Sequence, residues 1–375
     1  MRCSLYINIP FCKSKCRYCD FYSLAGHYGL VDEYIDALAR EWELHCRRGA
    51  WEIDTVFVGG GTPSVLTVRQ WERLHDRIFA RLPLRAGAEW TVECNPESFT
   101  EEKAALLAAM GVTRITFGIQ TLVDRELKTI GRPHSARLAL ELFGLPSLDR
   151  FESVGVDLMY GLPGQTAASF SGTVAAVLEY PAVRHISAYE LTVAASTPFG
   201  RHRSLLPLPG EDAMEVMTDM LCTMLAARGF EHYEVSNFAR DGHRCRHNCA
   251  CWDHQPYIGL GCAAHSYLHP RRFRNVADVG RYCAVINGGD FAVDDEETID
   301  AVTFAREMAF LRLRTADGLD EAVFRDKTGM DFDTWAGAER LTRFADDGLL
   351  IHQPPWWRPT SRGMWCADYI ARELF

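Results

Sequence analysis

The chain has 375 residues, of which 47% are hydrophobic and 24% charged, which is typical of a globular protein with one large domain and a smaller one. Its formal net charge of −10, from 40 basic and 50 acidic residues, argues against a general nucleic-acid binder. No run of 18 apolar residues predicts a membrane span, and the first residues do not resemble a secretory signal. We therefore expect a cytoplasmic protein with no nucleic-acid partner and at most peripheral membrane contact.

Short β-branched runs alternate with longer amphipathic segments through the first half of the chain. Strands are predicted over residues 5–9, 55–58, 90–93, 114–119, 153–157 and 185–189. Helices are predicted over residues 31–42, 71–78, 101–110, 136–143 and 169–178. Such alternation predicts an α/β fold with a parallel sheet, here a partial (β/α)6 TIM-like barrel with its site at the carboxyl ends of the strands.

The pattern changes beyond about residue 200. A helix is predicted over 210–227, a strand over 233–236, a loop rich in His, Cys and aromatic residues over 241–266, and a helix with an acidic start over 295–313. The last part predicts a small, mainly helical, winged-helix-like domain. We thus expect a barrel core over 1–205, a connecting region with the His/Cys/aromatic loop over 206–290, and a C-terminal helical domain over 291–375.

The chain has 13 cysteines, and in a large cytosolic protein clustered cysteines indicate metal more often than disulfides. Cys12, Cys16 and Cys19 follow the first predicted strand. Three thiolates from one loop can hold three corners of a [4Fe–4S] cluster and leave the fourth iron open to a small molecule. A zinc site is the alternative, but it lacks a fourth ligand at ordinary spacing. A second group can hold zinc or another cluster: Cys245, Cys249, Cys251 and Cys262.

Polar and glycine residues follow several of the predicted strands. Residues 59–63, Gly-Gly-Gly-Thr-Pro, end the second strand, where glycines let a ligand approach the backbone closely. Glu93, Gln120 and Asp157 end later strands, and Arg132 lies shortly downstream. Carboxylates and amides suit ribose hydroxyls, and a guanidinium suits a carboxylate. Together they outline a nucleoside pocket.

The order and spacing of these motifs resemble the radical S-adenosylmethionine (SAM) superfamily, in its coproporphyrinogen-oxidase-like branch. The motifs are Tyr6-x5-Cys12-x3-Cys16-x2-Cys19, Gly59–Pro63, Glu93-x-Asn95-Pro96, residues 117–120, Gly131-Arg132-x-His134, residues 157–166 and residues 185–192. The resemblance implies a [4Fe–4S] cluster whose open iron binds SAM and whose electron splits it to methionine and a 5′-deoxyadenosyl radical.

The resemblance also implies a role for each site residue. The methionyl end of SAM would be held by Tyr6, Gly60, Gly61 and Thr62, the remainder by Glu93, Gln120, Arg132 and Asp157, with Tyr18 near the adenine. One departure is Asn8, where relatives usually carry His.

Two features of the sequence favour a resemblance to heme chaperones of the HemW type over a resemblance to the oxidases. Asp20-Phe21 stands where the oxidases carry a fourth cysteine, and the chain begins only five residues before Tyr6. The implied cofactors and partners are then heme, heme-accepting proteins, an electron donor for the cluster and a possible homodimer. A radical SAM enzyme that modifies tetrapyrroles is the alternative.

The heme ligand is less evident from the sequence. Relatives carry His-Asn-x-x-Tyr-Trp, and this chain has His247-Asn248-Cys249-Ala250-Cys251-Trp252, with Cys251 in place of the tyrosine. Imidazole and thiolate both ligate heme iron, so His247 is the candidate ligand. The alternative is that His247 and Asn248 only hold their loop by hydrogen bonds.

Overall fold

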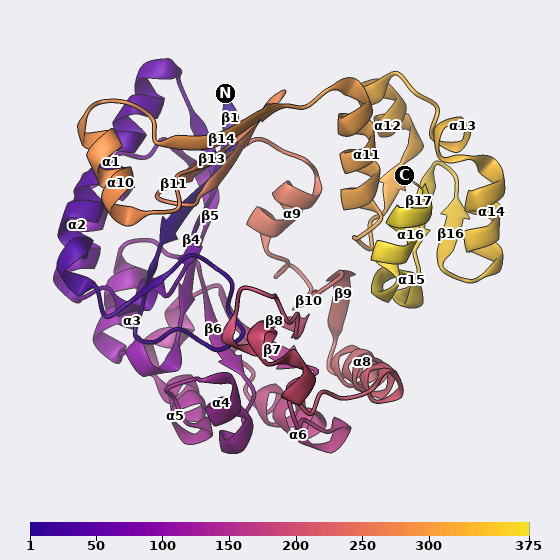
Figure 1. Ribbon diagram of the computed structural model, residues 1–375, viewed down its shortest axis with the longest axis horizontal. Coiled ribbons are helices and arrows are strands. Elements are labelled where there is room, and N and C mark those ends of the chain that lie inside the picture. The colour runs from indigo at the N-terminus through magenta and orange to yellow at the C-terminus, as the bar shows by residue number, and fades with distance from the viewer. Residues whose placement is uncertain (375) are drawn as a thin grey trace.

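A sheet of 12 strands forms the centre of the molecule (Figure 1). The computed structural model describes residues 1–374. All six strands predicted in the first half are confirmed, and they pair in parallel in chain order as the curved wall of a partial barrel. They are β1 (Arg2–Ile9), β4 (Glu52–Gly60), β5 (Leu84–Cys94), β6 (Arg114–Gln120), β7 (Ser153–Tyr160) and β8 (Val183–Glu190).

Strand β1 illustrates how the sequence assigns side chains to the two faces of this wall. Its odd-numbered residues, such as Leu5 and Ile7, are buried in the main hydrophobic core. Its even-numbered residues Ser4, Tyr6 and Asn8 make polar contacts with other residues. Because successive side chains of a strand point to opposite faces, the apolar row packs under the helices and the polar row faces the barrel interior.

The helices that connect the strands cover the outer face of the sheet (Figure 1). The five predicted helices are confirmed, and α4, which has only seven residues, was not predicted. Capping chemistry sets several of their starts; the Thr67 side chain, for example, accepts from the Gln70 backbone N–H ahead of α2. They are α1 (Val31–Arg48), α2 (Val68–Arg77), α3 (Glu101–Ala109), α4 (Asp124–Ile130), α5 (Ala136–Glu141) and α6 (Ala167–Leu178).

The region predicted to connect the two domains contributes strands to the same sheet. Beside β1, β11 (Tyr257–Leu260) pairs in parallel, followed by the antiparallel strands β12 (His265–Leu268), β13 (Arg271–Asn275) and β14 (Val293–Thr298). Beside β8 lie the antiparallel β10 (Asn237–Arg240) and β9 (Phe230–Glu234). The predicted strand 233–236 therefore begins earlier, and the helix predicted over 210–227 is α8 (Glu211–Ala226).

Two sequence predictions in this region are wrong. Residues 241–266 are not a loop, because they hold α9 (Arg246–Trp252) and β11. Strand β11 has four residues, and its pairing partner β1 is some 250 residues away in the chain, so no local pattern reveals it. The acidic residues 294–297 do not begin a helix either; they lie on β14, where Glu296 and Glu297 pair with arginines of β13. The helix α11 (Ala301–Arg312) starts after them, at the N-cap Asp300.

The C-terminal part has a hydrophobic core of its own, which includes Phe324, Phe344 and Trp357. Trp365, by contrast, packs against Tyr160 and His232 of the barrel. This domain is mainly helical, as predicted, and lies to one side of the barrel (Figure 1). Its elements are α11, α12 (Glu321–Thr328), α13 (Phe332–Ala336), α14 (Ala338–Asp346), α15 (Ser361–Trp365), α16 (Ala367–Leu374) and the small sheet β15 (Leu319–Asp320), β17 (Trp356–Pro359) and β16 (Leu350–Gln353).

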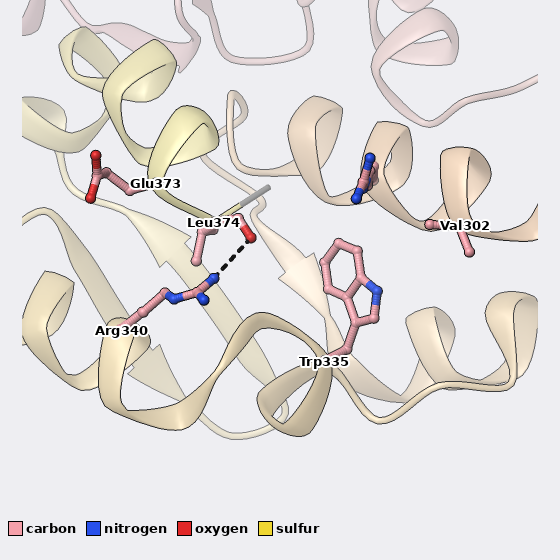
Figure 2. Close-up of a pocket in the computed structure, with 6 residues that line it drawn as sticks. Val302, Trp335, Arg340, Glu373 and Leu374 are labelled. Atoms are coloured by element: carbon pink, nitrogen blue, oxygen red, sulfur yellow. Dashed lines mark hydrogen bonds between the residues drawn. The ribbon is translucent and has the colours of Figure 1, made fainter.

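A cavity of about 580 Å³ lies within this C-terminal domain (Figure 2). The Arg340 guanidinium there donates to the Leu374 carbonyl at 3.3 Å, and Trp335 and Val302 line the opposite side. None of the predicted site residues lines this cavity. Within residues 1–374, no helix combines the length and the apolar character needed to cross a membrane.

Candidate functional site: a cysteine-lined cavity at the carboxyl ends of the strands

A second cavity, of about 430 Å³, opens where the parallel strands end. All the predicted site residues except Tyr6 and His247 line it. The fold thus gathers side chains that are spread from residue 12 to residue 157. The predicted residues in this wall are Cys12, Cys16, Tyr18, Cys19, Gly60, Gly61, Thr62, Glu93, Gln120, Arg132 and Asp157.

The three cysteines lie in a loop that two short strands hold at its base. β2 (Phe11–Cys12) pairs with β3 (Leu24–Ala25), and between them the Cys19 backbone N–H donates to the Cys16 carbonyl at 3.3 Å. Burial raises the pKa of the Cys12 thiol, which a hydrogen bond from the Thr62 hydroxyl, 3.5 Å from Sγ, partly offsets. Burial also raises the pKa of the Cys19 thiol. Metal binding must therefore displace protons from these thiols.

The second group of cysteines does not come together. Cys245 Sγ lies 3.5 Å from the Glu89 carboxylate, whereas Cys262 Sγ lies 3.8 Å from the Tyr34 hydroxyl in another part of the core. Nowhere in residues 1–374 do three His, Cys, Asp or Glu side chains converge on one position for a metal ion. The hypothesis of a zinc site formed by these cysteines together with Cys262 is therefore wrong. The same finding holds for Cys12, Cys16 and Cys19, and it is compatible with a cluster, because thiolates on separate corners of a cubane need not meet at one point.

Two glycines form the floor of the cavity beside the cysteine loop. Gly60 has φ +106°, and a Cβ there would collide with the Asn8 side-chain oxygen. A Cβ on Gly61 would lie 2.8 Å from the Phe11 carbonyl oxygen. Asn8 itself is held by a 2.7 Å hydrogen bond from Nδ2 to the Cys262 carbonyl. Glycine is therefore required here both for backbone conformation and for space.

One wall of the cavity is a hydrogen-bonded row of polar side chains. Asn95 Nδ2 donates to Thr62 Oγ1 at 3.0 Å, and Arg132 Nη1 donates to Asn95 Oδ1 at 3.1 Å. Arg132 Nε is buried without a hydrogen-bond partner among the described residues. A buried guanidinium with a spare N–H is suited to a carboxylate ligand. Asn95 was not among the predicted site residues, although its motif was recognised.

Two carboxyl groups face the cavity from neighbouring strands. Glu93 Oε2 accepts from the Gly60 backbone N–H at 3.1 Å, and Asp157 Oδ1 accepts from the Thr116 hydroxyl at 3.2 Å. Burial, together with the nearby Asp157, raises the pKa of Glu93 to about 8, and burial also raises the pKa of Asp157. A cationic or hydroxyl-bearing ligand would relieve the cost of ionising two buried carboxyl groups side by side.

Gln120 has an unusual backbone conformation for a residue other than glycine. Its φ is +68°, and the pairing of β6 with β7 shifts register between Gly118 and Gln120. A Cβ on Gly118 would lie 2.7 Å from Asn95 Oδ1 and 3.1 Å from Gln120 Nε2. Left-handed backbone at a residue with a side chain is strained and occurs often at functional sites. Gln120 lines the cavity from this position.

Tyr6 and His247 lie below the cavity, in successive layers of the barrel interior. Tyr6 is in register with Phe57 of β4 and packs against its ring at 6.1 Å, with its hydroxyl 3.4 Å from Asn8 Oδ1. One layer further, at Thr55, His247 Nδ1 lies 2.8 Å from the Thr55 hydroxyl. Asn8 therefore lies between Tyr6 and the glycines of the cavity floor. The predicted direct contact of Tyr6 with SAM stays a prediction.

His247 is buried, with 5% of its surface exposed, and its ring packs on Phe57 at 5.1 Å. Burial lowers its pKa to about 4. The Glu89 carboxylate accepts from its backbone N–H at 3.0 Å and so holds the start of α9. These contacts agree with the alternative hypothesis that His247 holds its own segment in place by hydrogen bonds. Because the imidazole is buried, a heme iron could reach it only if α9 moved. Heme ligation by His247 stays a prediction.

Part of the cavity wall lies beyond the predicted SAM residues. Met159, Tyr189, Glu190 and Thr192 extend it along the ends of β7 and β8. Phe21, the residue in place of a fourth cysteine, lines the mouth and is 65% exposed. Met159, Tyr189, Glu190 and Thr192 lie within the recognised motifs 157–166 and 185–192, but they were not predicted as site residues.

Comparison with known proteins identifies the family. Residues 6–177 match the model of the radical SAM superfamily, and residues 299–366 match the HemN C-terminal domain. A protein of Bacillus subtilis (strain 168) named heme chaperone HemW is 35% identical over 334 residues, 88% of this chain and 88% of the relative. This chain belongs to the HemW family of the radical SAM superfamily. A protein of the same name from Escherichia coli (strain K12) is 32% identical over 96% of this chain and 94% of its own length.

The fold of this HemW-family chain is also that of a solved structure. Coproporphyrinogen III oxidase (HemN) from Escherichia coli, described as a radical SAM enzyme, aligns over 99% of this chain and 89% of its own with a TM-score of 0.86 and 21% identity. At that identity the likeness concerns the fold, a TIM-like α/β barrel with a helical C-terminal domain. The similarity to the two HemW proteins is equally extensive, since the alignments cover 88% and 94% of their lengths.

Membership of the superfamily implies a [4Fe–4S] cluster and SAM, and the residues of the cavity fit both. Three thiols in one loop match a cluster with one open iron. The backbone of Gly60 and Gly61 lines the cavity beside that loop, and the unpartnered Arg132 Nε lies in the buried wall. The facing carboxyl groups of Glu93 and Asp157 suit ammonium or hydroxyl donors.

Proposed function

We propose that this protein is a heme chaperone of the HemW type, which binds a [4Fe–4S] cluster, SAM and heme and passes heme to recipient proteins. The single observation that carries the proposal is the cavity in which Cys12, Cys16 and Cys19 meet the glycine floor and the Asn95–Arg132 wall. The relatives named heme chaperones, similar over nearly their whole length, support the heme part.

In this proposal each element of the cavity has one task. Cys12, Cys16 and Cys19 hold three irons of the cluster, which supplies one electron for cleavage of SAM. Gly60, Gly61 and Thr62 accommodate the methionyl group of SAM. Glu93, Gln120, Arg132 and Asp157 bind its polar atoms and Tyr18 lies against the adenine. The chaperone would act in the cytoplasm, with heme-accepting proteins and an electron donor as partners and a homodimer as a possible assembly.

A radical SAM enzyme that modifies tetrapyrroles is the second candidate. The observation in its favour is the additional wall of Met159, Tyr189, Glu190 and Thr192, which offers space for a second ligand next to the predicted SAM site. The replacement of a fourth cysteine by Asp20-Phe21 and the names of the relatives favour the chaperone.

Anaerobic reconstitution followed by heme titration distinguishes the two. A chaperone shifts the Soret band at stoichiometric heme and then transfers the heme to an apo-acceptor without consuming SAM in proportion. An enzyme instead converts coproporphyrinogen or heme in step with 5′-deoxyadenosine formation. No Soret shift at one equivalent would contradict the chaperone. Titration of His247→Leu and, as its neighbour on the same helix, Cys251→Ser then tests which side chain ligates the iron.

A further inference from the structure

Exposed basic side chains surround the loop that carries the three cysteines. Lys13, Lys15 and Arg17 alternate with the cysteines in the chain, and all three are exposed. This is notable in a protein with a net charge of −10. The positive charge is therefore local and sits on the segment closest to the predicted cluster.

Two neighbouring helices extend this positive surface. The Arg17 backbone N–H donates to the Ile130 carbonyl at 3.0 Å, at the end of α4, and its carbonyl accepts from the Phe199 N–H at 3.0 Å, in α7 (Pro198–Arg201). The Arg17 guanidinium also reaches the Thr129 carbonyl at 3.3 Å. The loop, α4 and α7 thus lie side by side. The exposed cations of these elements and of the turn after α7 form what we call the basic collar: Lys13, Lys15, Arg17, Arg125, Lys128, Arg201 and Arg203.

The charges of the basic collar are not neutralised within the protein. In residues 1–374 none of its members forms an ion pair with a carboxylate; Lys15, Arg125 and Arg201, for example, donate to backbone carbonyls. Arginines of β13 behave differently, since Arg271 and Arg272 each pair with a glutamate of β14. The exposed carboxylates on the cysteine loop and α4 are Asp20 and Asp124. A cluster of unpaired cations produces a field that attracts an acidic partner.

Two large apolar side chains are exposed within this charged surface. Phe21 is 65% exposed, and Lys15 Nζ donates to its carbonyl at 2.9 Å. Leu205 is 78% exposed, two residues after Arg203. Exposed apolar side chains with arginines around them are characteristic of protein–protein contacts.

We propose that the basic collar is the docking surface for an acidic, low-potential electron-transfer protein. The inference rests on the proposed function, because it assumes a cluster at Cys12, Cys16 and Cys19. The donor's reduced centre loses one electron and the cluster gains it, so no other reactant is required. The collar lies on and beside the loop that carries the three cysteines, so a protein docked there lies next to the predicted cluster. Electrostatic steering suits such transient contacts, which bury little surface.

The test is the rate at which the reconstituted cluster is reduced, followed by stopped-flow bleaching near 400 nm, the region of thiolate-bound cluster absorbance. The reductant is a reduced plant-type [2Fe–2S] ferredoxin, an acidic protein. The collar variant is Lys128→Glu, Arg201→Glu and Arg203→Glu, none of which lies next to a cysteine in the chain. The matched control carries the same charge change on α1, α2 and α12, as Arg47→Glu, Arg69→Glu and Lys327→Glu.

At low ionic strength we expect the collar variant to be reduced about 10-fold or more slowly than wild type, with a flatter salt dependence, since steering accelerates association by about 10- to 1,000-fold. The control should keep the wild-type rate. Reduction by the methyl viologen radical cation, which the collar repels, should not slow in either variant. Equal ferredoxin rates for the collar variant and wild type would overturn the proposal.

Two further measurements test whether the collar binds a membrane instead and whether the proposed function holds. Equal ferredoxin rates, combined with collar-dependent sedimentation on phosphatidylserine vesicles, would assign the collar to an anionic membrane and overturn the proposal. Iron content and the heme-induced Soret shift, measured on wild type and collar variant, test the proposed function separately. A protein that takes up its cluster but binds no heme would contradict heme transfer and leave the ferredoxin result standing.

Discussion

The Arg132 guanidinium donates a hydrogen bond to the Asn95 amide oxygen across 3.1 Å, and the same amide donates to Thr62. Asn95 thereby connects the end of β5 to the loop after β4 and to the arginine that follows α4. Thr62 in turn contacts Cys12 Sγ. The orientation of Arg132 is thus coupled to the cysteine loop through two neutral side chains, Asn95 and Thr62.

Replacement of Asn95 by Ala should weaken SAM binding while leaving the cluster in place. Loss of a hydrogen bond to a charged group costs about 1.5–3 kcal/mol, so the dissociation constant should rise roughly 10- to 100-fold. Calorimetric titration of SAM into the anaerobically reconstituted variant measures this. The control is Asn287→Ala, which removes an exposed Arg40–Asn287 hydrogen bond of 2.7 Å on the surface. Unchanged affinity in Asn95→Ala would exclude this role.

Replacement of Cys16 by Ser should give a folded protein without the brown cluster absorbance near ~400 nm, because a thiolate ligand is lost. Iron content per chain and the visible spectrum measure the effect. Two cysteines serve as controls: Cys46 is exposed on α1, and Cys94 lines the same cavity without belonging to the loop. Their serine variants should keep full iron content. Iron retained in Cys16→Ser, or lost in Cys94→Ser, would revise the ligand set.

Replacement of Gly60 by Ala should be more damaging than an alanine at an open glycine of similar conformation. Gly87 also has positive φ, +71°, but a Cβ there meets nothing within 4 Å. Both variants carry left-handed strain of about 1–2 kcal/mol. Only Gly60→Ala adds a collision with Asn8. Thermal unfolding should show the larger loss of stability for Gly60→Ala, together with loss of SAM binding. Equal losses would show that space beside Asn8 does not matter.

Glu93 makes the stability of the ligand-free protein depend on pH. Its pKa, near 4.5 when unfolded, is raised to about 8 by burial and by Asp157. The folded state therefore holds a proton that the unfolded state releases, and the stability associated with it is complete below pH 4.5 and is lost as the pH rises through 8. Glu93→Gln removes this loss and keeps an oxygen acceptor for Gly60.

Between pH 6 and pH 9, Glu93→Gln should gain on the order of 2–3 kcal/mol in unfolding free energy relative to wild type. Wild type loses about 1.4 kcal/mol for each of the roughly two pH units between pH 6 and the folded pKa of Glu93. Urea unfolding at both pH values measures the difference. SAM binding should weaken in the same variant, because the carboxylate is gone. A gain that is the same at pH 6 and pH 9 would show that Glu93 does not titrate in this range.

Local patterns in the sequence determined most of the barrel. The alternation of Leu5, Ile7 and Ile9 with polar residues, and the apolar spacing of α1, each depend on neighbours within a few residues. The same holds for the cysteine spacing and the glycines at residues 59–61, which are read from one segment. This is why the six parallel strands, and eleven of the residues that line the cavity, could be predicted before their arrangement was known.

Only the tertiary structure decided how distant segments meet. Strand β11 pairs with β1 some 250 residues earlier in the chain, and the acidic residues of β14 pair with arginines on β13. His247 lies below the cavity, with its ring 2.8 Å from the Thr55 hydroxyl. Hydrogen bonds likewise join Arg17 of the basic collar to residues 129, 130 and 199. Such contacts depend on packing and sheet register between segments far apart in the chain, and no periodicity within one segment encodes them.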